Sequence, residues 1–362
     1  MDDSRYNEMI YITSVVKENI KKIINAKDVD QMPTGLSHNF MFLYEQRLHS
    51  DIWLRPYVCA MLLKQYGYLY DNSHINVDII PALMAAEIFN ISTYQSNIVF
   101  DDKINNKSVR NVNQIISSFI SLNLASILLS ELHIDAPSKV ECINKLNYNN
   151  NLVYQGQYID LNILTTDNFE TITQMSYEQY IDLYMKRCEL IGGTTVENCA
   201  YWACKIANIT DINYIETICR LFRTWGQMMQ MVNDLSDFAY IIDRKYIRYT
   251  DVRAGKITLP LYLILKSGGK DVANEIMNNI PIRDDHDLYL IFKKYLYKDS
   301  HVIQCIYAIM REKWTECNTL ITGLRLNKKI FSFMFENAFL TKYSRFFFSN
   351  RLIDKKNGKL NL

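Results

Sequence analysis

Apolar residues recur at helical spacing along almost the whole chain, and this periodicity constrains the fold more than any other feature. Helices are predicted at residues 57–69, 79–100, 112–132, 177–207 and 215–242, with turns at 71–73, 135–138, 147–151, 167–168 and 267–269. Glycine and proline number only 11 and 6 of 362 residues, so the chain lacks the turn residues that sheet-rich folds need. The sequence therefore predicts an all-α fold.

Charge and cysteine content exclude several classes of protein. Forty Lys and Arg residues balance 39 Asp and Glu residues, so we expect no nucleic-acid partner. The eight cysteines form no Cys-x-x-Cys pair and are expected to be buried free thiols. The polar N-terminus and the absence of an uninterrupted apolar run of membrane-spanning length predict no signal peptide, no transmembrane segment and a cytoplasmic location.

Two acidic segments carry the chemistry that the sequence suggests. Asp101, Asp102 and Asn105 end a predicted helix, where an isolated acidic pair is most often a solvated helix end. Asn233, Asp234 and Asp237 lie instead among apolar neighbours. Burying carboxylates is costly without compensating cations, and two oxygen-rich faces suit Mg²⁺ shared with a diphosphate.

Basic residues follow or lie between the acidic segments. Lys186 and Arg187 belong to a predicted helix, and Arg248 and Lys256 follow the second segment. Each alone is an ordinary surface base, but together they supply charges and a planar fork for phosphate oxygens. The combination predicts a diphosphate-binding site.

The order of these motifs resembles the trans-isoprenyl diphosphate synthase, or polyprenyl synthetase, family. Between residues 52 and 265, the two acidic segments resemble its aspartate-rich motifs. Gly156-Gln157-x-x-Asp160-Leu161 resembles its GQxxDL segment, Gly255-Lys256-Ile-Thr258-Leu259-Pro260 resembles its GKxTLP segment, and Lys186 and Gln230 fall at expected places. Six motifs in register are a specific signal.

The resemblance implies an all-α class I isoprenoid synthase bundle around a central cavity. We expect one domain over residues 1–350, with the core resemblance at 52–265, extra helices at 270–350 and a flexible tail at 351–362. It also implies a homodimer and three Mg²⁺ ions when substrate is bound.

The site residues that the resemblance implies fall into four groups. The metal ligands are Asp101, Asp102, Asn105, Asn233, Asp234 and Asp237. The diphosphate contacts are Arg110, Lys186, Arg187, Gln230, Arg248 and Lys256. The catalytic residues are Asp101, Asp102, Asp234, Lys186 and Arg187. The walls of the prenyl pocket are Phe89, Tyr94, Asn97, Phe100, Tyr154, Gln157 and Tyr158, any of which could equally be core packing.

Departures from the family pattern bear on the reaction. Ile52 and Trp53 stand where chain-elongating members have Lys and Arg that hold isopentenyl diphosphate, and Asn111 replaces a second arginine after Arg110. These changes resemble those of members that became terpene synthases. Arg187 also resembles, by its spacing from Asn233, an arginine of class I terpene cyclases, although the final glutamate of their second motif is missing.

The sequence therefore predicts a Mg²⁺-dependent terpene synthase or cyclase that ionises one prenyl diphosphate and releases diphosphate. The small residues Ser96 and Asn97 favour a farnesyl or geranylgeranyl chain. One alternative is a prenyltransferase, either chain-elongating or acting on an uncharged acceptor. A second alternative is a non-catalytic subunit of a prenyl synthase.

Overall fold

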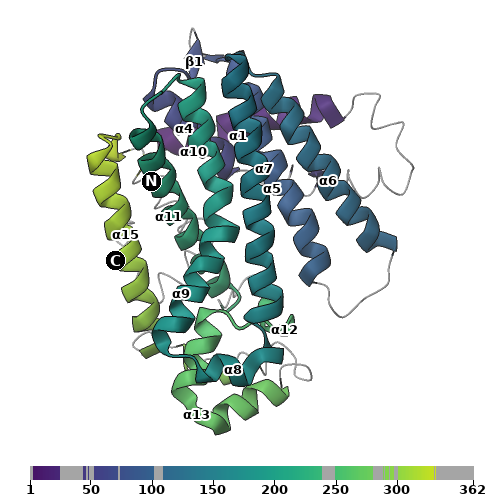
Figure 1. Cartoon of the computed structure of the whole chain (residues 1–362), viewed down its shortest axis with the longest axis vertical. Helices are drawn as coiled ribbons and strands as arrows, with labels where there is room; N and C mark the ends of the chain where they lie inside the picture. The colour runs from purple at the N-terminus through teal and green to yellow at the C-terminus, as the bar shows by residue number, and fades with distance from the viewer. Residues whose placement is uncertain are drawn as a thin grey trace. The chain divides into compact units, whose positions relative to one another are not determined.

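The protein is helical almost throughout, as the apolar periodicity predicts (Figure 1). The computed structural model describes residues 3–24, 44–45, 48, 53–71, 74–101, 109–238, 249–279, 288, 290–292, 294–296, 301–329 and 331. Within these residues, the strands are β1 (Tyr70–Asp71) and β2 (His74–Ile75), an antiparallel hairpin at the predicted turn. The all-α prediction is confirmed.

The chain forms two compact units. The first comprises Met1–Asn151 and Thr195–Arg220, and the second comprises Leu152–Thr194 and Leu221–Leu362. The expectation of one domain over residues 1–350 stays a prediction, and the tail at 351–362 lies outside the described residues.

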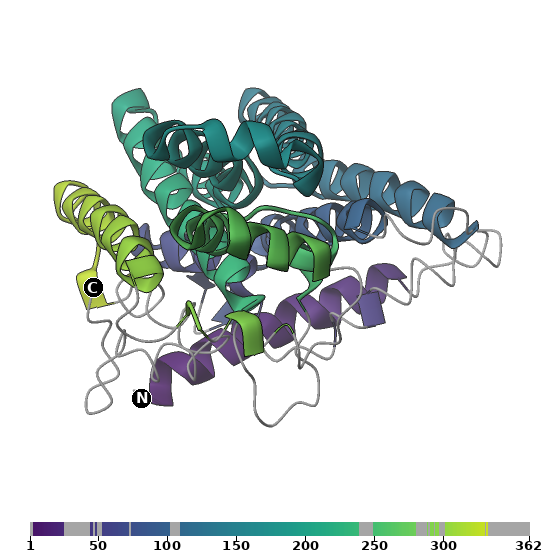
Figure 2. The same ribbon diagram turned by 90° about the horizontal axis from the view of Figure 1, so that it is seen from below.

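The first unit is built on long helices that pack side by side. They are α1 (Asp3–Ile24), α4 (Leu54–Gln65), α5 (Ile80–Asp101) after the 3₁₀ turn η1 (Val77–Ile79), α6 (Val109–Ser130), most of α7 (Ala136–Tyr158), nearly all of α10 (Thr194–Ile206) and the start of α11 (Ile212–Ser236). α5 packs along α6 (Figure 2). Both α1 and α4 also contact α5. Tyr57, Phe89 and Trp202 are fully buried in its core.

The turn predicted at residues 147–151 is wrong, because this asparagine-rich stretch lies inside α7. Asn149 is fully buried, and its amide Nδ2 donates to Oδ1 of Asn198 in α10 at 2.8 Å. Nearby, Lys145 Nζ lies 2.6 Å from Oε1 of Glu197. Pairing across a helix interface satisfies the polar side chains that would otherwise favour a turn.

The second unit contains both short and long helices and two π-helical turns. Its elements are the π turn η2 (Ile159–Ile163), the 3₁₀ turn η3 (Thr166–Asn168), α8 (Phe169–Gln174), α9 (Tyr177–Cys188), the π turn η4 (Glu189–Gly193), the rest of α11, α12 (Thr250–Arg253), α13 (Leu259–Asn279) and α15 (His301–Gly323). η4 is a π turn inside the helix predicted at 177–207, and the backbone stays helical on both sides of it. The left-handed Gly269 (φ 71°) breaks α13 at the predicted turn.

Glycines set the closest helix approach in this unit. An added Cβ at Gly226 of α11 would lie 2.5 Å from the carbonyl oxygen of Gly192 and 2.6 Å from Cα of Gly193. Backbone therefore meets backbone where η4 crosses α11. π turns of this kind often occur at functional sites.

α6 is the described helix that has the length and hydropathy of a membrane span. Its segment Val112–Ser130 has a mean hydropathy of 1.6 and is 39% buried in the fold. A core helix of a soluble protein meets the same criterion. Among the cysteines, all eight are free, seven are buried and Cys305 is partly exposed, in line with the expected free thiols.

The glycine crossing predicts that Gly226→Ala lowers the free energy of unfolding by about 1–3 kcal/mol, since a methyl group there must push backbone apart. Gly323→Ala is the matched control, because no heavy atom lies within 4 Å of an added Cβ at that position. Chemical denaturation of both variants measures the difference. Equal stability of the two variants would contradict the close approach.

Candidate active site

Close packing around the two π turns brings three charged side chains of the second unit together. Asp160 lies in η2, Arg187 in the last turn of α9 and Asp234 near the end of α11. Gly156 permits this approach, because an added Cβ there would lie 2.7 Å from Cγ1 of Ile191. The glycine of the Gly156-Gln157 pair thus allows η4 to pack closely against the end of α7.

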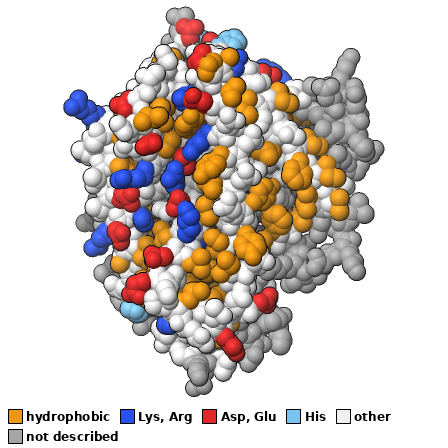
Figure 3. All heavy atoms as spheres, in the orientation of Figure 1, with side chains coloured by type: hydrophobic (Ala, Val, Ile, Leu, Met, Phe, Trp, Pro, Cys, Tyr) orange, Lys and Arg blue, Asp and Glu red, His pale blue; other side chains and the backbone are white. Residues whose placement is uncertain are grey.

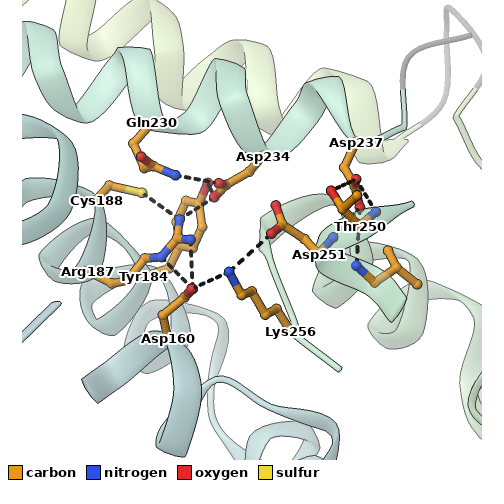
Figure 4. A network of polar contacts seen from close by, with 11 residues as sticks. Asp160, Tyr184, Arg187, Cys188, Gln230, Asp234, Asp237, Thr250, Asp251 and Lys256 are labelled. Atoms are coloured by element: carbon orange, nitrogen blue, oxygen red, sulfur yellow. Dashed lines mark hydrogen bonds and ion pairs between the residues drawn. The ribbon is translucent and has the colours of Figure 1, made fainter. Parts of the chain in front are cut away.

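The Arg187 guanidinium lies between the carboxylates of Asp160 and Asp234 (Figure 4). Its Nε and Nη2 atoms contact Oδ1 of Asp160 at 2.8 and 2.7 Å, and Nη1 contacts Oδ2 of Asp234 at 2.6 Å. The exposed fractions of the Arg187, Asp160 and Asp234 side chains are 3%, 3% and 0%. These three groups, called the ion triad below, are joined by charge-assisted hydrogen bonds out of contact with water.

Asp234 has two further donors. The Tyr184 hydroxyl of α9 donates to its Oδ2 atom at 2.8 Å. Gln230, one turn earlier on α11, donates from Nε2 to Oδ1 at 2.8 Å. Protein donors therefore reach both carboxylate oxygens.

Lys256 supplies the second cation. Its Nζ atom lies 2.9 Å from Oδ2 of Asp160 and 3.2 Å from Oδ1 of Asp251. The preceding Gly255 is left-handed (φ 76°), and its carbonyl accepts a hydrogen bond from the Thr166 amide at 2.8 Å. The glycine of the GKxTLP-like segment thus allows the turn that places Lys256 beside η2.

Asp237 caps the start of α12. Its Oδ1 atom accepts bonds from the amide and the hydroxyl of Thr250 at 2.6 and 3.0 Å. Its Oδ2 atom accepts bonds from the amides of Asp251 and Val252 at 3.1 and 3.2 Å. All four donors belong to the first three residues of α12, so Asp237 holds that short helix against the end of α11.

Burial and charge pull the pKa values of these carboxyls in different directions. Burial alone would raise the pKa of Asp160, but Arg187 and Lys256 outweigh it and hold that pKa below its ordinary value. Burial keeps the pKa of Asp234 above its ordinary value despite Arg187. Burial and the nearby Asp251 carboxylate raise the pKa of Asp237 to about 8, against the opposing hydrogen bonds of α12.

The second acidic segment, as it lies, does not fit a shared Mg²⁺ ion. Asn233 is exposed, whereas Asp234 is engaged in the ion triad and Asp237 caps α12. Within the described residues, no three His, Cys, Asp or Glu side chains gather in a way that could hold a metal ion. Magnesium requires near-octahedral oxygen ligands, and the carboxylates of Asp234 and Asp237 are each bonded to a different set of protein donors.

The other residues predicted to contact metal or diphosphate are outside the described residues, exposed, or buried. Asp102, Asn105 and Arg248 fall outside the described residues, as do the side chains of Asp101 and Arg110. Lys186 is exposed, with Nζ 3.5 Å from Oε1 of Glu189. Gln230, Arg187 and Lys256 belong to the buried network already described.

The predicted walls of the prenyl pocket differ in exposure. Phe89 is fully buried and Gln157 nearly so, while Asn97, Phe100 and Tyr154 are half-buried. Tyr94 and Tyr158 are 48% and 62% exposed, so as they lie neither suits the wall of a dry cavity. Phe89 fits the alternative of core packing.

Sequence reasoning missed Tyr184 and Asp251 and gave Asp160 no role in the site. Asp160 stood within the quoted GQxxDL-like segment, which was the available signal. Nothing in the spacing of Asp237 and Thr250 indicates a helix cap, because a long connection separates them.

Comparison with known proteins identifies the family and the fold. The model of the polyprenyl synthetase family matches residues 101–295, more than half of the chain. A geranylgeranyl pyrophosphate synthase structure shares 16% identity over 93% of this chain and 98% of its own, with a TM-score of 0.70.

Two further solved structures are similar. One is the Corynebacterium glutamicum geranylgeranyl pyrophosphate synthase complexed with calcium and isoprenyl diphosphate (18% identity, 95% and 98% coverage, TM-score 0.64). The other is the Helicobacter pylori octaprenyl pyrophosphate synthase, with 13% identity over 94% of this chain and 99% of its own and a TM-score of 0.62. No curated protein matches the sequence.

The capping geometry predicts that Asp237→Ala lowers the free energy of unfolding by about 1–3 kcal/mol in metal-free buffer, because four donors lose their acceptor. Asp182→Ala, which removes an exposed carboxylate from α9, is the matched control. Thermal and urea unfolding compare the two. If Asp237 served only as a metal ligand, both variants would be equally stable without metal.

Proposed function

Since the chain belongs to the polyprenyl synthetase family, we propose that it is an enzyme that ionises a single prenyl diphosphate. The C1–O bond breaks, the electron pair leaves with diphosphate, and the allylic cation reacts within its own chain. Loss of a proton then gives a hydrocarbon, and addition of water gives an alcohol. Farnesyl or geranylgeranyl diphosphate is the proposed substrate, and its chain length and the cytoplasmic location stay predictions.

Burial of Trp53 is the observation that carries this proposal. The resemblance assigns this position to an arginine that holds isopentenyl diphosphate in chain-elongating members. Here the Trp53 side chain is 0% exposed, and its backbone amide donates to Oγ1 of Thr13 at 3.1 Å. An indole in the core offers a second diphosphate none of the charge-assisted bonds, each worth about 1.5–3 kcal/mol, that an arginine would supply.

The diphosphate of the single substrate needs positively charged contacts. We assign one contact to Lys186, which projects into solvent from the last turn of α9. Arg110 and Arg248 are the further proposed contacts. These charges neutralise the leaving diphosphate as the bond breaks. The resemblance also implies Mg²⁺ at Asp101, Asp102 and Asn105, which stays a proposal.

A non-catalytic subunit is the second candidate, and the closed second acidic segment favours it. Asp234 and Asp237 are satisfied by protein donors, an arrangement that a catalytic metal site does not require. Chain elongation is the third possibility, which the burial of Trp53 disfavours.

Product analysis separates the three. Purified protein is incubated with Mg²⁺ and geranyl, farnesyl or geranylgeranyl diphosphate, each with and without isopentenyl diphosphate, and Asp102→Ala serves as the background control. We expect a hydrocarbon or alcohol and released diphosphate from one substrate alone. Longer prenyl diphosphates would establish chain elongation instead. Diphosphate release no greater than that of the Asp102→Ala variant would favour the non-catalytic subunit.

We also propose a homodimer, which the resemblance implies, with α6 at the contact. Val112, Ile116, Phe119 and Ile127 are 59%, 40%, 54% and 54% exposed, so α6 presents an apolar face. Figure 3 shows hydrophobic side chains gathered on the side of the molecule where α6 lies. A second copy would cover these side chains.

Phe119→Asp is therefore expected to convert the dimer to a monomer, because a carboxylate would be buried in the contact. Val140→Asp is the matched control, since Val140 is 55% exposed on α7. Light scattering after size-exclusion chromatography measures the mass. A wild-type monomer, or a Phe119→Asp dimer, would overturn the proposed contact.

A further inference from the structure

We infer that Arg187 is the permanent cation of the second acidic segment and occupies the place at Asp234 that a divalent ion would need. The chain would thus satisfy this carboxylate with its own guanidinium. This role concerns metal binding by the resting protein and goes beyond the proposed reaction.

The bonding of Asp234 leaves little room for an ion. Its Oδ2 atom receives two donors, Nη1 of Arg187 at 2.6 Å and the Tyr184 hydroxyl at 2.8 Å. A carboxylate oxygen accepts about two hydrogen bonds, so this oxygen is saturated. Its Oδ1 atom receives the Gln230 amide, and the whole side chain is 0% exposed. An ion could reach Asp234 only at the remaining acceptor site of Oδ1, beside the Gln230 amide, unless it displaced one of these donors.

Cations of the chain already contact both carboxylates of the ion triad. Arg187 and Lys256 lie within 2.6–2.9 Å of these carboxylates, and Asp251, 3.2 Å from Lys256 Nζ, adds a third negative charge to the network. A divalent ion at Asp234 would bring two more positive charges close to a buried guanidinium. Repulsion at that distance is strong in a poorly solvated site, so binding there is opposed.

The same contacts separate this role from that of a diphosphate ligand. All three nitrogens that could bind phosphate oxygens already contact carboxylates. The residue is 2% exposed, whereas its neighbour Lys186 is exposed to solvent. Arg187 therefore acts on the second segment, and Lys186 is left to meet the substrate.

Counting bound Mn²⁺ in the full-length protein without substrate tests this assignment. Mn²⁺ is the probe because its free and bound forms are distinguished by electron paramagnetic resonance. Arg187→Gln removes the cation but keeps a polar side chain, Arg187→Lys keeps the charge, and Arg223→Gln is the control for removing a half-exposed arginine of α11.

The expected result is one additional Mn²⁺ ion in Arg187→Gln and the wild-type number in Arg187→Lys and Arg223→Gln. The melting temperature of Arg187→Gln should fall by at least 5 °C in EDTA and recover by at least half with millimolar Mn²⁺. Addition of Mn²⁺ should raise the melting temperature of the wild-type protein no more than that of Arg223→Gln. Loss of stability without any added Mn²⁺ site would overturn the assignment.

Asp234→Asn gives a second test that does not depend on the folding of Arg187→Gln. The variant keeps an oxygen for Tyr184 and leaves Arg187 paired with Asp160. It should bind as many Mn²⁺ ions as wild type, because Asp234 holds none. One fewer ion would show that Asp234 is a metal ligand and would contradict the assignment. Neither count requires turnover, so an inactive enzyme in the product assay does not affect this result.

Discussion

The structure of the second unit depends on keeping three charged side chains out of water. Taking Asp160, Arg187 and Asp234 from solvent costs several kcal/mol per ion, and only close geometry offsets that cost. The fold supplies this geometry through the glycine contacts at Gly156 and Gly226, which let α7, η4 and α11 approach at backbone distance. Removing one partner of such a triad leaves an uncompensated buried charge. The same packing that forms the site therefore makes its charges hard to exchange.

This internal pairing changes what the family pattern means in this chain. The motifs of a polyprenyl synthetase are present in order, but two positions that the family uses for external charge are turned inward. Trp53 lies in the core of the first unit, and Asp234 is neutralised inside the second. We propose that both features reduce the binding of additional charged groups, the first that of a second diphosphate and the second that of a metal ion. An enzyme of this kind is expected to handle one diphosphate with fewer resident ions.

Helix positions could be predicted from the sequence because they depend on local periodicity. Four of the five strongest helical segments coincide with α4, α5, α6 and α11 to within a few residues at most ends. The turn predicted at 147–151 failed because its asparagines are satisfied by a distant helix, which composition does not reveal. The π turn within 177–207 could not be predicted, and it lies where Gly192 closely approaches Gly226, a contact that local periodicity does not reveal.

The candidate site was predictable in composition but not in connectivity. The residue types and order identified Asp234, Asp237, Arg187 and Lys256 as a group. Which of them bind each other and which bind a ligand depends on distances of a few tenths of an ångström, and spacing along the chain does not encode these. The role of Asp237 as a metal ligand stays a prediction, and its four hydrogen bonds to α12 are a contact that the sequence did not reveal.

Anomalous diffraction from crystals soaked in Mn²⁺ tests the central claim most directly. The predicted map shows Arg187 between Asp160 and Asp234, and no manganese peak within bonding distance of the Asp234 carboxylate. A peak at Asp234, with the Arg187 guanidinium displaced toward solvent or toward a bound diphosphate, would contradict the account.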